Sequence, residues 1–309
     1  MNPDLRGMAS LASAVGHTPL LELSAGLGLA APARLFAKLE SVNPGASIKD
    51  RPVLRMLQAG VAAGCLNGGR RLLDSSSGNA GVSYAMFGAA LGVPVSIVVP
   101  GNASAERLAR IAAHGAELIL TDPQEGYDYA LLTARRLAEE FPERYWYCNQ
   151  YANAENWRAH YAGTGAEIVQ QLAVQGLSAD CFVAGVGTGG TLTGAGRRLR
   201  EANPRLAIVA AIPDAFPGID GLKPLGASGD IVPDILDAGL IGERVAITAE
   251  DALAMCRRLA RLGLFVGPSA GAYVHVALQI ARRGDVRTIV TVLSDAGERY
   301  LSLGIWPLP

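Results

Sequence analysis

The sequence predicts an α/β protein with two open, mostly parallel sheets, each flanked by helices. Short apolar runs alternate with helical patterns along most of the 309 residues, an order typical of strands joined by covering helices. Uncharged runs such as Ser96-Ile-Val-Val99 are typical of strands buried on both faces. Half of the residues are apolar, which is enough for a large core.

The expected elements follow in chain order. A strand at 71–73 leads into the loop Asp74–Gly78 and a helix at 80–91, and Ser104 is a suitable N-cap for a helix at 104–114. Pro213–Pro233 is rich in Gly and Pro and is expected to form a long loop, and long loops in compact domains are often functional lids. The other strands are expected at 95–99, 117–120, 145–148, 181–186, 206–212 and 288–293, and the other helices at 127–140, 163–172, 191–201, 250–262 and 270–282.

Composition excludes several classes of function. The 27 basic and 28 acidic residues leave no basic excess for a nucleic-acid partner. The uncharged stretch Ser75–Ala105 is broken by Gly88, Gly92 and Pro94, so a buried helix, turn and strand explain it better than a membrane span. The four cysteines form no CxxC pair and no metal-binding spacing, and no basic and apolar signal region opens the chain. We therefore expect a cytoplasmic protein without a metal site.

Lysine is rare, since only Lys38, Lys49 and Lys223 are found among the 27 basic residues. Arginine stays protonated and cannot replace a lysine in amine chemistry, so each lysine is informative. Lys49 lies in the segment Asn43-Pro-Gly-Ala-Ser-Ile-Lys49 and is followed by Asp50. It could form a surface ion pair with Asp50, or it could be an amine that forms a Schiff base.

The loop Gly185-Val-Gly-Thr-Gly-Gly-Thr191 lies between an expected strand and an expected helix. Small residues let backbone N–H groups converge there, and a helix N-terminus favours an anion. The loop lacks the Gly-Lys-Ser/Thr ending of a nucleoside-triphosphate loop, and no acidic residue ends a strand about 20 residues later, as a dinucleotide site requires. The phosphate of a cofactor is the preferred ligand; a dinucleotide and plain turn glycines are the alternatives.

Two further loops precede expected helices. Asp74-Ser-Ser-Ser-Gly-Asn-Ala-Gly81 offers hydroxyls and an amide to a carboxylate or a ring oxygen, although an ordinary serine N-cap explains it equally well. Ser269 in Gly267-Pro-Ser-Ala-Gly271 could cap a helix or bind a ligand. Together with a phosphate cradle, Lys49 indicates pyridoxal phosphate, with the lysine for its aldehyde and a hydroxyl for its pyridine nitrogen.

These residues give the chain a resemblance to the cysteine synthase family of pyridoxal-phosphate enzymes, which includes cystathionine β-synthase. The segments 43–49, 76–81, 185–191 and 267–271 match in the family's order, and Gly16-His-Thr-Pro-Leu20 and Gly297-Glu-Arg-Tyr-Leu301 resemble its opening and closing segments. The resemblance implies the tryptophan synthase β-like fold type II. It also implies a larger cofactor-binding domain of residues 1–52 and 153–309 and a smaller, mobile substrate domain of residues 53–152.

The resemblance assigns a role to each matching position. Lys49 would be the Schiff-base lysine and the acid and base at Cα, Asn79 would bind the ring oxygen, and Ser269 would face the pyridine nitrogen. The family usually has threonine at the position of Ala80, so the chain departs from the pattern in its substrate loop. The phosphate would be held by Gly187, Thr188, Gly189, Gly190 and Thr191, and the substrate by Ser76, Ser77, Gly78, Ala80 and Gln150.

The implied reaction is β-replacement on an O-activated L-serine, O-acetylserine or O-phosphoserine, through an α-aminoacrylate. L-Cysteine formation is the first expectation. The segment Asn149–Tyr161 also resembles siderophore enzymes that use O-phosphoserine and join glutamate to the aminoacrylate on the way to 2,3-diaminopropionate, as do Asp50-Arg-Pro52 and Leu225-Gly-Ala-Ser228. His160 and Arg158 are candidates to contact a phosphate leaving group, although a surface position at a helix start is the preferred interpretation of Arg158. A serine or threonine dehydratase and a cofactor-free interaction protein of the same fold are the alternatives of other classes. The family implies a homodimer and a possible serine acetyltransferase partner.

Overall fold

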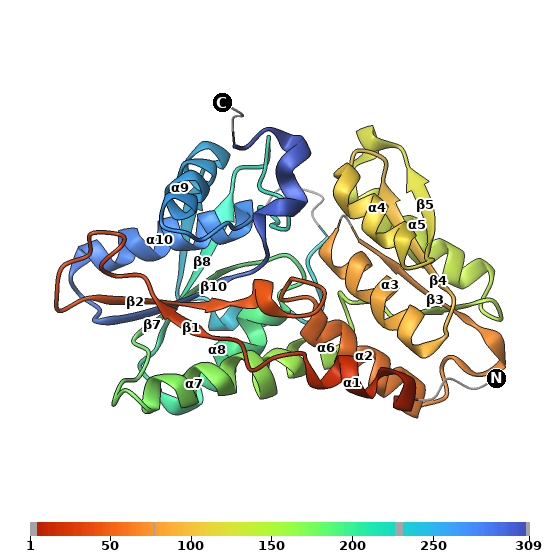
Figure 1. Ribbon diagram of the computed structural model, residues 1–309, viewed down its shortest axis with the longest axis horizontal. Coiled ribbons are helices and arrows are strands. Elements are labelled where there is room, and N and C mark those ends of the chain that lie inside the picture. The colour runs from red at the N-terminus through yellow and green to blue at the C-terminus, as the bar shows by residue number, and fades with distance from the viewer. Residues whose placement is uncertain (1–4, 77, 226–230, 307–309) are drawn as a thin grey trace.

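A computed structural model describes residues 5–76, 78–225 and 231–306 and contains two β-sheets that lie side by side (Figure 1). The first has six strands in the order β1-β2-β10-β7-β8-β9, and the second has four in the order β5-β4-β3-β6. Among the strand pairs of the described residues, only β1–β2 is antiparallel. The predicted α/β class with two mostly parallel sheets is confirmed.

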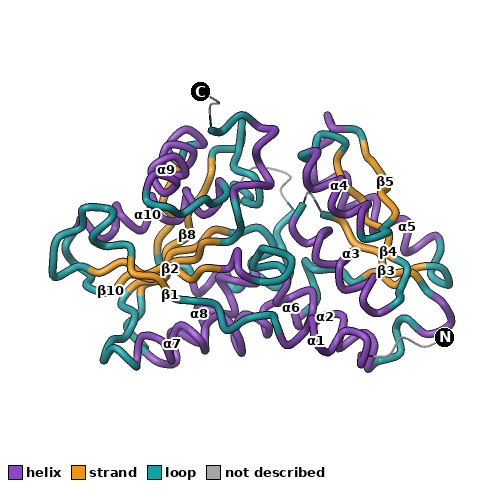
Figure 2. Tube along the Cα trace, viewed as in Figure 1, coloured by secondary structure: helices purple, strands orange, loops and turns teal. Residues whose placement is uncertain are grey.

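The six-stranded sheet lies between two layers of helices (Figure 2). Helices α7 (Ala166–Ala173) and α8 (Gly190–Ala202) cover one face, and α9 (Ala249–Arg261) and α10 (Pro268–Arg283) cover the other. The central strand β10 is buried along its whole length, as expected for a parallel strand covered on both faces. The strands of the six-stranded sheet are β1 (Leu20–Glu22), β2 (Arg34–Leu39), β7 (Cys181–Gly185), β8 (Ala207–Pro213), β9 (Glu243–Ile247) and β10 (Thr288–Leu293).

The four-stranded sheet is also covered on both faces. Leu72 belongs to an apolar cluster with residues of α3 (Asn79–Leu91) and α4 (Ala105–Ala113), whereas the next residue, Leu73, packs with α5 (Gly126–Glu140). Neighbouring side chains of a strand point to opposite faces, so the two clusters lie on opposite sides of the sheet. Its strands are β3 (Arg71–Ser75), β4 (Val95–Pro100), β5 (Glu117–Thr121) and β6 (Tyr145–Tyr147).

Further helices connect these parts of the fold. Helix α2 (Asp50–Ala62) packs against both α3 and α6 (Ala154–Ala159), and α1 (Ala9–Ser13) lies near the amino terminus. The strands of the four-stranded sheet come from residues 71–147 alone. The division of the chain at residues 53 and 152, and the mobility of the smaller part, stay predictions.

The predicted elements lie within a few residues of the observed ones, but three strands and three helices were not predicted: β1, β2, β9, α1, α2 and α6. One predicted detail is also wrong. Ser104 occupies the N-cap position of α4, but its hydroxyl donates to the carbonyl oxygen of Arg299 over 2.9 Å instead of capping the helix. The uncharged stretch 75–105 forms the end of β3, the buried helix α3 and the buried strand β4. Among the described residues, no helix has the length and apolar character needed to cross a membrane.

The predicted long loop follows β8. Its described residues, 214–225 and 231–233, contain no helix or strand. Residues 226–228 of the motif Leu225-Gly-Ala-Ser228 lie outside the described part of the chain, and a lid function stays a prediction.

Candidate active site

A cavity of about 740 Å³ lies where loops of both sheets meet, at the carboxyl ends of their parallel strands. It is lined by every predicted site residue that the structure describes, whereas Ser77 lies outside the described residues. The roles of these residues stay predictions, but the structure brings together segments that are far apart in the sequence. The predicted residues that line the cavity are Lys49, Ser76, Gly78, Asn79, Ala80, Gln150, Gly187, Thr188, Gly189, Gly190, Thr191 and Ser269.

Lys49 is a half-buried amine that precedes the first residue of α2. Its ammonium forms no ion pair with Asp50, whose carboxylate instead accepts from the Gly45 N–H and, over 2.5 Å, from the Ser83 hydroxyl. Burial lowers the pKa of Lys49, and the charge of Asp295 opposes this shift only in part. A lowered pKa increases the fraction of neutral amine, the form needed for attack on an aldehyde.

The glycine loop connects β7 to α8 with no space for a Cβ at any of its four glycines. A Cβ on Gly187 would lie 2.6 Å from the carbonyl oxygen of Gly221, and a Cβ on Gly190 would lie 2.0 Å from Oδ1 of Asn156. The helix starts at Gly190, so its free N–H groups meet at the cavity. A concave backbone with two threonine hydroxyls at a helix N-terminus fits the phosphate of pyridoxal phosphate.

The serine loop at the end of β3 is fixed by its own hydrogen bonds. The Ser76 hydroxyl oxygen accepts from the N–H groups of Gly78, over 3.1 Å, and Gly81, over 2.8 Å. The N-cap of α3 is Gly78, so Ser76 is not an ordinary N-cap, but its oxygen stabilises the start of the helix while its own O–H remains a donor for a ligand. Both functions are compatible, because they use different atoms of the same group.

A buried carboxylate joins the serine loop to Gln150. Asp74 accepts from the backbone N–H of Ser75 over 2.8 Å, from the Tyr84 hydroxyl over 2.6 Å and from the backbone N–H of Gln150 over 3.1 Å. The Gln150 side chain donates to the carbonyl oxygen of Ser75 over 2.7 Å. Burial raises the pKa of Asp74 to about 7, while its hydrogen bonds act in the opposite direction. Asp74 was not predicted as a site residue.

Ser269 lies in the first turn of α10 and lines the cavity. The N-cap of that helix is Gly267, without a side-chain hydrogen bond, so Ser269 does not cap it. A buried serine hydroxyl that faces a cavity is a suitable neutral partner for a pyridine nitrogen.

Two ion pairs are formed by residues that line the cavity, and neither pair was predicted from the sequence. Arg107 of α4 pairs with Asp220 of the long loop, and Lys223 of the same loop pairs with Asp128 of α5 over 2.5 Å. Arg107 and Lys223 are both buried and line the cavity. Each pair joins a helix of the four-stranded sheet to the loop after β8, so the loop is held over the cavity at two points.

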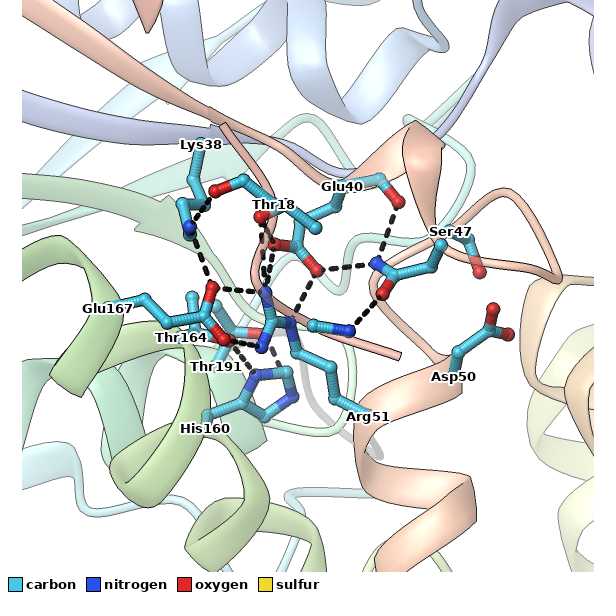
Figure 3. A network of polar contacts seen from close by, with 12 residues as sticks. Thr18, Lys38, Glu40, Ser47, Asp50, Arg51, His160, Thr164, Glu167 and Thr191 are labelled. Atoms are coloured by element: carbon cyan, nitrogen blue, oxygen red, sulfur yellow. Dashed lines mark hydrogen bonds and ion pairs between the residues drawn. The ribbon is translucent and has the colours of Figure 1, made fainter. Parts of the chain in front are cut away.

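A buried network of charges lies next to the lysine segment (Figure 3). Figure 3 shows Arg51 between Glu40 and Glu167. Its Nε lies 2.7 Å from Oε2 of Glu40, and its Nη1 lies 2.6 Å from Oε1 of Glu167. Lys38, fully buried in β2, pairs with the same Glu167 carboxylate at 2.7 Å. Two cations and two anions balance, which a buried site requires. The network fixes the first turn of α2, two residues after Lys49.

Neither candidate for contact with a phosphate leaving group lines the cavity, and Arg158 has the surface position that was preferred for it. His160 does not line the cavity; it is buried beneath the glycine loop, with Nδ1 3.0 Å from the Thr164 hydroxyl and Nε2 3.4 Å from that of Thr191. Arg158 forms an exposed ion pair with Glu155 at 2.5 Å. His160 therefore supports the glycine loop from beneath, whereas Arg158 lies at the surface.

Comparison with known proteins agrees with this site. Residues 11–295 match the family model of pyridoxal-phosphate dependent enzymes. A cysteine synthase of Aquifex aeolicus is 42% identical over 313 residues, covering 98% of this chain and 94% of the relative. The crystal structure of an O-ureido-L-serine synthase is 35% identical with a TM-score of 0.84, covering 96% of this chain and 94% of that one. A cysteine synthase of Entamoeba histolytica is 31% identical with a TM-score of 0.87, covering 97% and 90%.

Proposed function

The chain belongs to the family of pyridoxal-phosphate dependent enzymes, and we propose that it forms L-cysteine from an O-activated L-serine. Its relatives place it among enzymes that use pyridoxal phosphate for β-replacement on such serines. The observation that carries the proposal is one cavity that unites a half-buried lysine, a glycine cradle at a helix N-terminus and a serine loop. The cysteine synthases among its relatives support sulfide as the nucleophile.

We assign the cofactor to the side of the cavity formed by the glycine loop, Asn79 and Ser269. The N–H groups of Gly187–Thr191 and the hydroxyls of Thr188 and Thr191 would hold the phosphate. When bound, pyridoxal phosphate supplies an aldehyde for amines and a ring that withdraws electrons from Cα of the amino acid. The neutral Ser269 hydroxyl would leave the pyridine nitrogen unprotonated, which favours prompt loss of the β-substituent over transamination.

Lys49 would perform the proton transfers. Its lowered pKa keeps a fraction of the amine neutral, so Nζ can take the proton from Cα of the donor. The acetate or phosphate group then leaves Cβ with the bonding electrons, sulfide adds to Cβ, and Lys49 returns a proton to Cα. Its position at the start of α2, where the buried charge network holds the chain, limits the range over which Nζ can move.

The donor's carboxylate would bind at the serine loop. The Ser76 O–H, the backbone N–H groups at the start of α3 and the Gln150 side chain are donors at this edge of the cavity. Ala80 lacks the hydroxyl that the family usually has, so this chain would bind the carboxylate with one side-chain donor fewer. We infer weaker donor binding, not a different reaction.

A second candidate is the addition of glutamate in place of sulfide. The specific observation in its favour is that two buried cations, Arg107 and Lys223, line the cavity in addition to Lys49. An anionic nucleophile, or the phosphate of O-phosphoserine, could exchange with the Asp220 and Asp128 carboxylates that now neutralise them. The same cations leave the choice between O-acetylserine and O-phosphoserine to experiment.

The test mixes the holoenzyme with each donor and follows the visible absorbance of the cofactor. We expect one of the two donors to change the spectrum and sulfide to restore it while cysteine forms. Restoration by glutamate and not by sulfide would select the second candidate. If neither donor changes the spectrum and serine releases pyruvate and ammonia, the protein is a dehydratase and the proposal is wrong. Lys49→Ala is the control that should remove the response.

Three other properties stay predictions. These are the homodimer, the serine acetyltransferase partner and the cytoplasmic location. Each can be measured on the purified protein or in cells without reference to the reaction.

A further inference from the structure

The side-chain amide of Asn79 is held at both ends by opposite charges. Its Nδ2 donates to Oδ2 of Asp295 over 2.6 Å, and its Oδ1 accepts from the guanidinium of Arg299. Both partners are buried, with 0% of Asp295 and 5% of Arg299 exposed. The closing segment of the chain thus reaches back to a residue far earlier in the sequence, with a separation of 216 residues between Asn79 and Asp295.

Because Asp295 and Arg299 carry opposite charges, only one orientation of the Asn79 amide is favourable. Rotated by half a turn, it would place its oxygen against the Asp295 carboxylate and its NH₂ group against the Arg299 guanidinium. Both contacts would be repulsive, and low polarity around buried groups strengthens such repulsion. Tyr300 also donates to Oδ2 of Asp295 over 2.6 Å, so this oxygen receives two donors and carries no proton.

This arrangement leaves Asn79 one N–H without a partner among the described residues, on a side chain that lines the cavity. We propose that Asp295 and Arg299 are positioning residues that lock the Asn79 amide so that its N–H, and not its oxygen, is offered to the ring oxygen of the cofactor. The inference rests on the proposed function, because it takes pyridoxal phosphate as the ligand and Asn79 as the partner of its ring oxygen.

The closing residues 294–299 also contact the segment 43–49 that contains Lys49. The Arg299 guanidinium also donates to the carbonyl oxygen of Gly45, and the Ile48 N–H donates to the carbonyl oxygen of Ser294 over 2.8 Å. Residues 294–299 therefore fix the position of the Asn79 amide relative to the backbone beside Lys49. These residues contact both groups that the cofactor ring would meet, the Asn79 amide and the backbone beside Lys49.

A double-mutant cycle on cofactor binding tests the inference. The apoproteins of wild type, Asn79→Ala, Asp295→Leu and the double variant are titrated with pyridoxal phosphate, and the dissociation constant and the visible absorbance maximum are recorded. We expect each single variant to bind about tenfold more weakly, the value of one hydrogen bond to a ring oxygen. The loss in the double variant should be clearly smaller than the product of the two single losses, since Asp295 acts partly through Asn79 and only the remainder of its effect, its charge beside Lys49, is separate.

Asp50→Leu combined with Asn79→Ala is the matched control. Asp50 is an equally buried carboxylate that contacts the segment 43–49 through Gly45 but makes no contact with the Asn79 side chain. Its effect on the dissociation constant should multiply with that of Asn79→Ala. Thermal unfolding of each apoprotein separates loss of cofactor binding from loss of fold.

The outcomes separate this inference from the proposed function. If wild type binds pyridoxal phosphate but Asp295→Leu and Asn79→Ala act independently, the positioning role is wrong while the proposed function stands. If wild type does not bind pyridoxal phosphate, the proposed function itself fails. Should Asp295→Leu not fold, Arg299→Gln takes its place in the cycle, and independence from Asn79→Ala would again overturn the proposal.

Discussion

The substitution Glu167→Gln is predicted to destabilise the protein strongly, because it removes one anion from the buried network beside the lysine segment. The Glu167 carboxylate accepts from Arg51 over 2.6 Å and pairs with Lys38 over 2.7 Å. Glutamine can accept from one of these cations, but its NH₂ group then faces the other. Lys38 is fully buried, burial already lowers the pKa of its ammonium, and the substitution removes the carboxylate that it contacts.

The expected loss follows from burial. Removing one partner of a buried ion pair costs about 3–5 kcal/mol, because an uncompensated charge remains in a medium of low polarity. The matched control is Glu22→Gln, the same chemical change in the exposed pair Arg34–Glu22, whose side chains are 35% and 38% exposed and lie 2.6 Å apart. An exposed pair contributes about 0–1 kcal/mol, so the two variants should differ by roughly 3 kcal/mol.

Urea unfolding of wild type and the two variants, followed by circular dichroism, measures the free energy of unfolding. Burial alone would raise the pKa of Glu167, but the hydrogen bonds from Arg51 and Lys38 hold it well below its usual value. A depressed pKa stabilises the folded protein above the unfolded pKa and loses that effect as the pH falls. The acid-induced loss should therefore be smaller in Glu167→Gln than in wild type. Equal losses of stability in Glu167→Gln and Glu22→Gln at pH 7 would refute the reasoning.

Three further predictions concern the cavity. Gly190→Ala should weaken cofactor binding in a titration of the apoprotein, because its Cβ would lie 2.0 Å from Oδ1 of Asn156; unchanged affinity would mean that the cradle is not the phosphate site. Asp74→Asn should flatten the pH dependence of stability: burial raises the pKa of Asp74 to about 7, above its unfolded value, so wild type loses up to about 1.4 kcal/mol per pH unit from this group as the pH rises from about 4 to 7. The free energy of unfolding of both proteins is measured with urea at pH 5 and at pH 7. If it changes by the same amount between the two pH values in wild type and in Asp74→Asn, that assignment is wrong. Lys223→Gln should raise the KM for O-phosphoserine more than that for O-acetylserine if a phosphate contacts the ammonium, and equal effects on both donors in steady-state kinetics would exclude the contact.

The sequence predicts the fold well where one physical signal dominates. Strand β10 and helix α3 are uncharged and mostly buried, and both are found where they were expected. Strand β2 was missed because it carries Arg34 and Lys38, and Lys38 is buried only because Glu167, more than a hundred residues away, neutralises it. Helix α2 was missed because its first turn contains Asp50 and Arg51, whose partners come from other segments.

Prediction of the site residues from the sequence is limited in the same way. The lysine segment and the three loops are local patterns, and each appears in the sequence as a short run of special residues. Asp295 and Arg299 act on Asn79 across 216 and 220 residues, and Arg107 reaches Asp220 across 113, so no local pattern marks them. Lys223 carried a signal in its rarity, but only the structure shows that it faces the cavity.

The most direct test of the account is to find which lysine carries the cofactor. The purified protein is loaded with pyridoxal phosphate, reduced with borohydride and digested, and the labelled peptide is identified by mass spectrometry. The chain has three lysines, and the account predicts the label on Lys49 alone, because Lys38 is fully buried against Glu167 and Lys223 is paired with Asp128. A label on Lys38 or Lys223, or no label on Lys49, would contradict it.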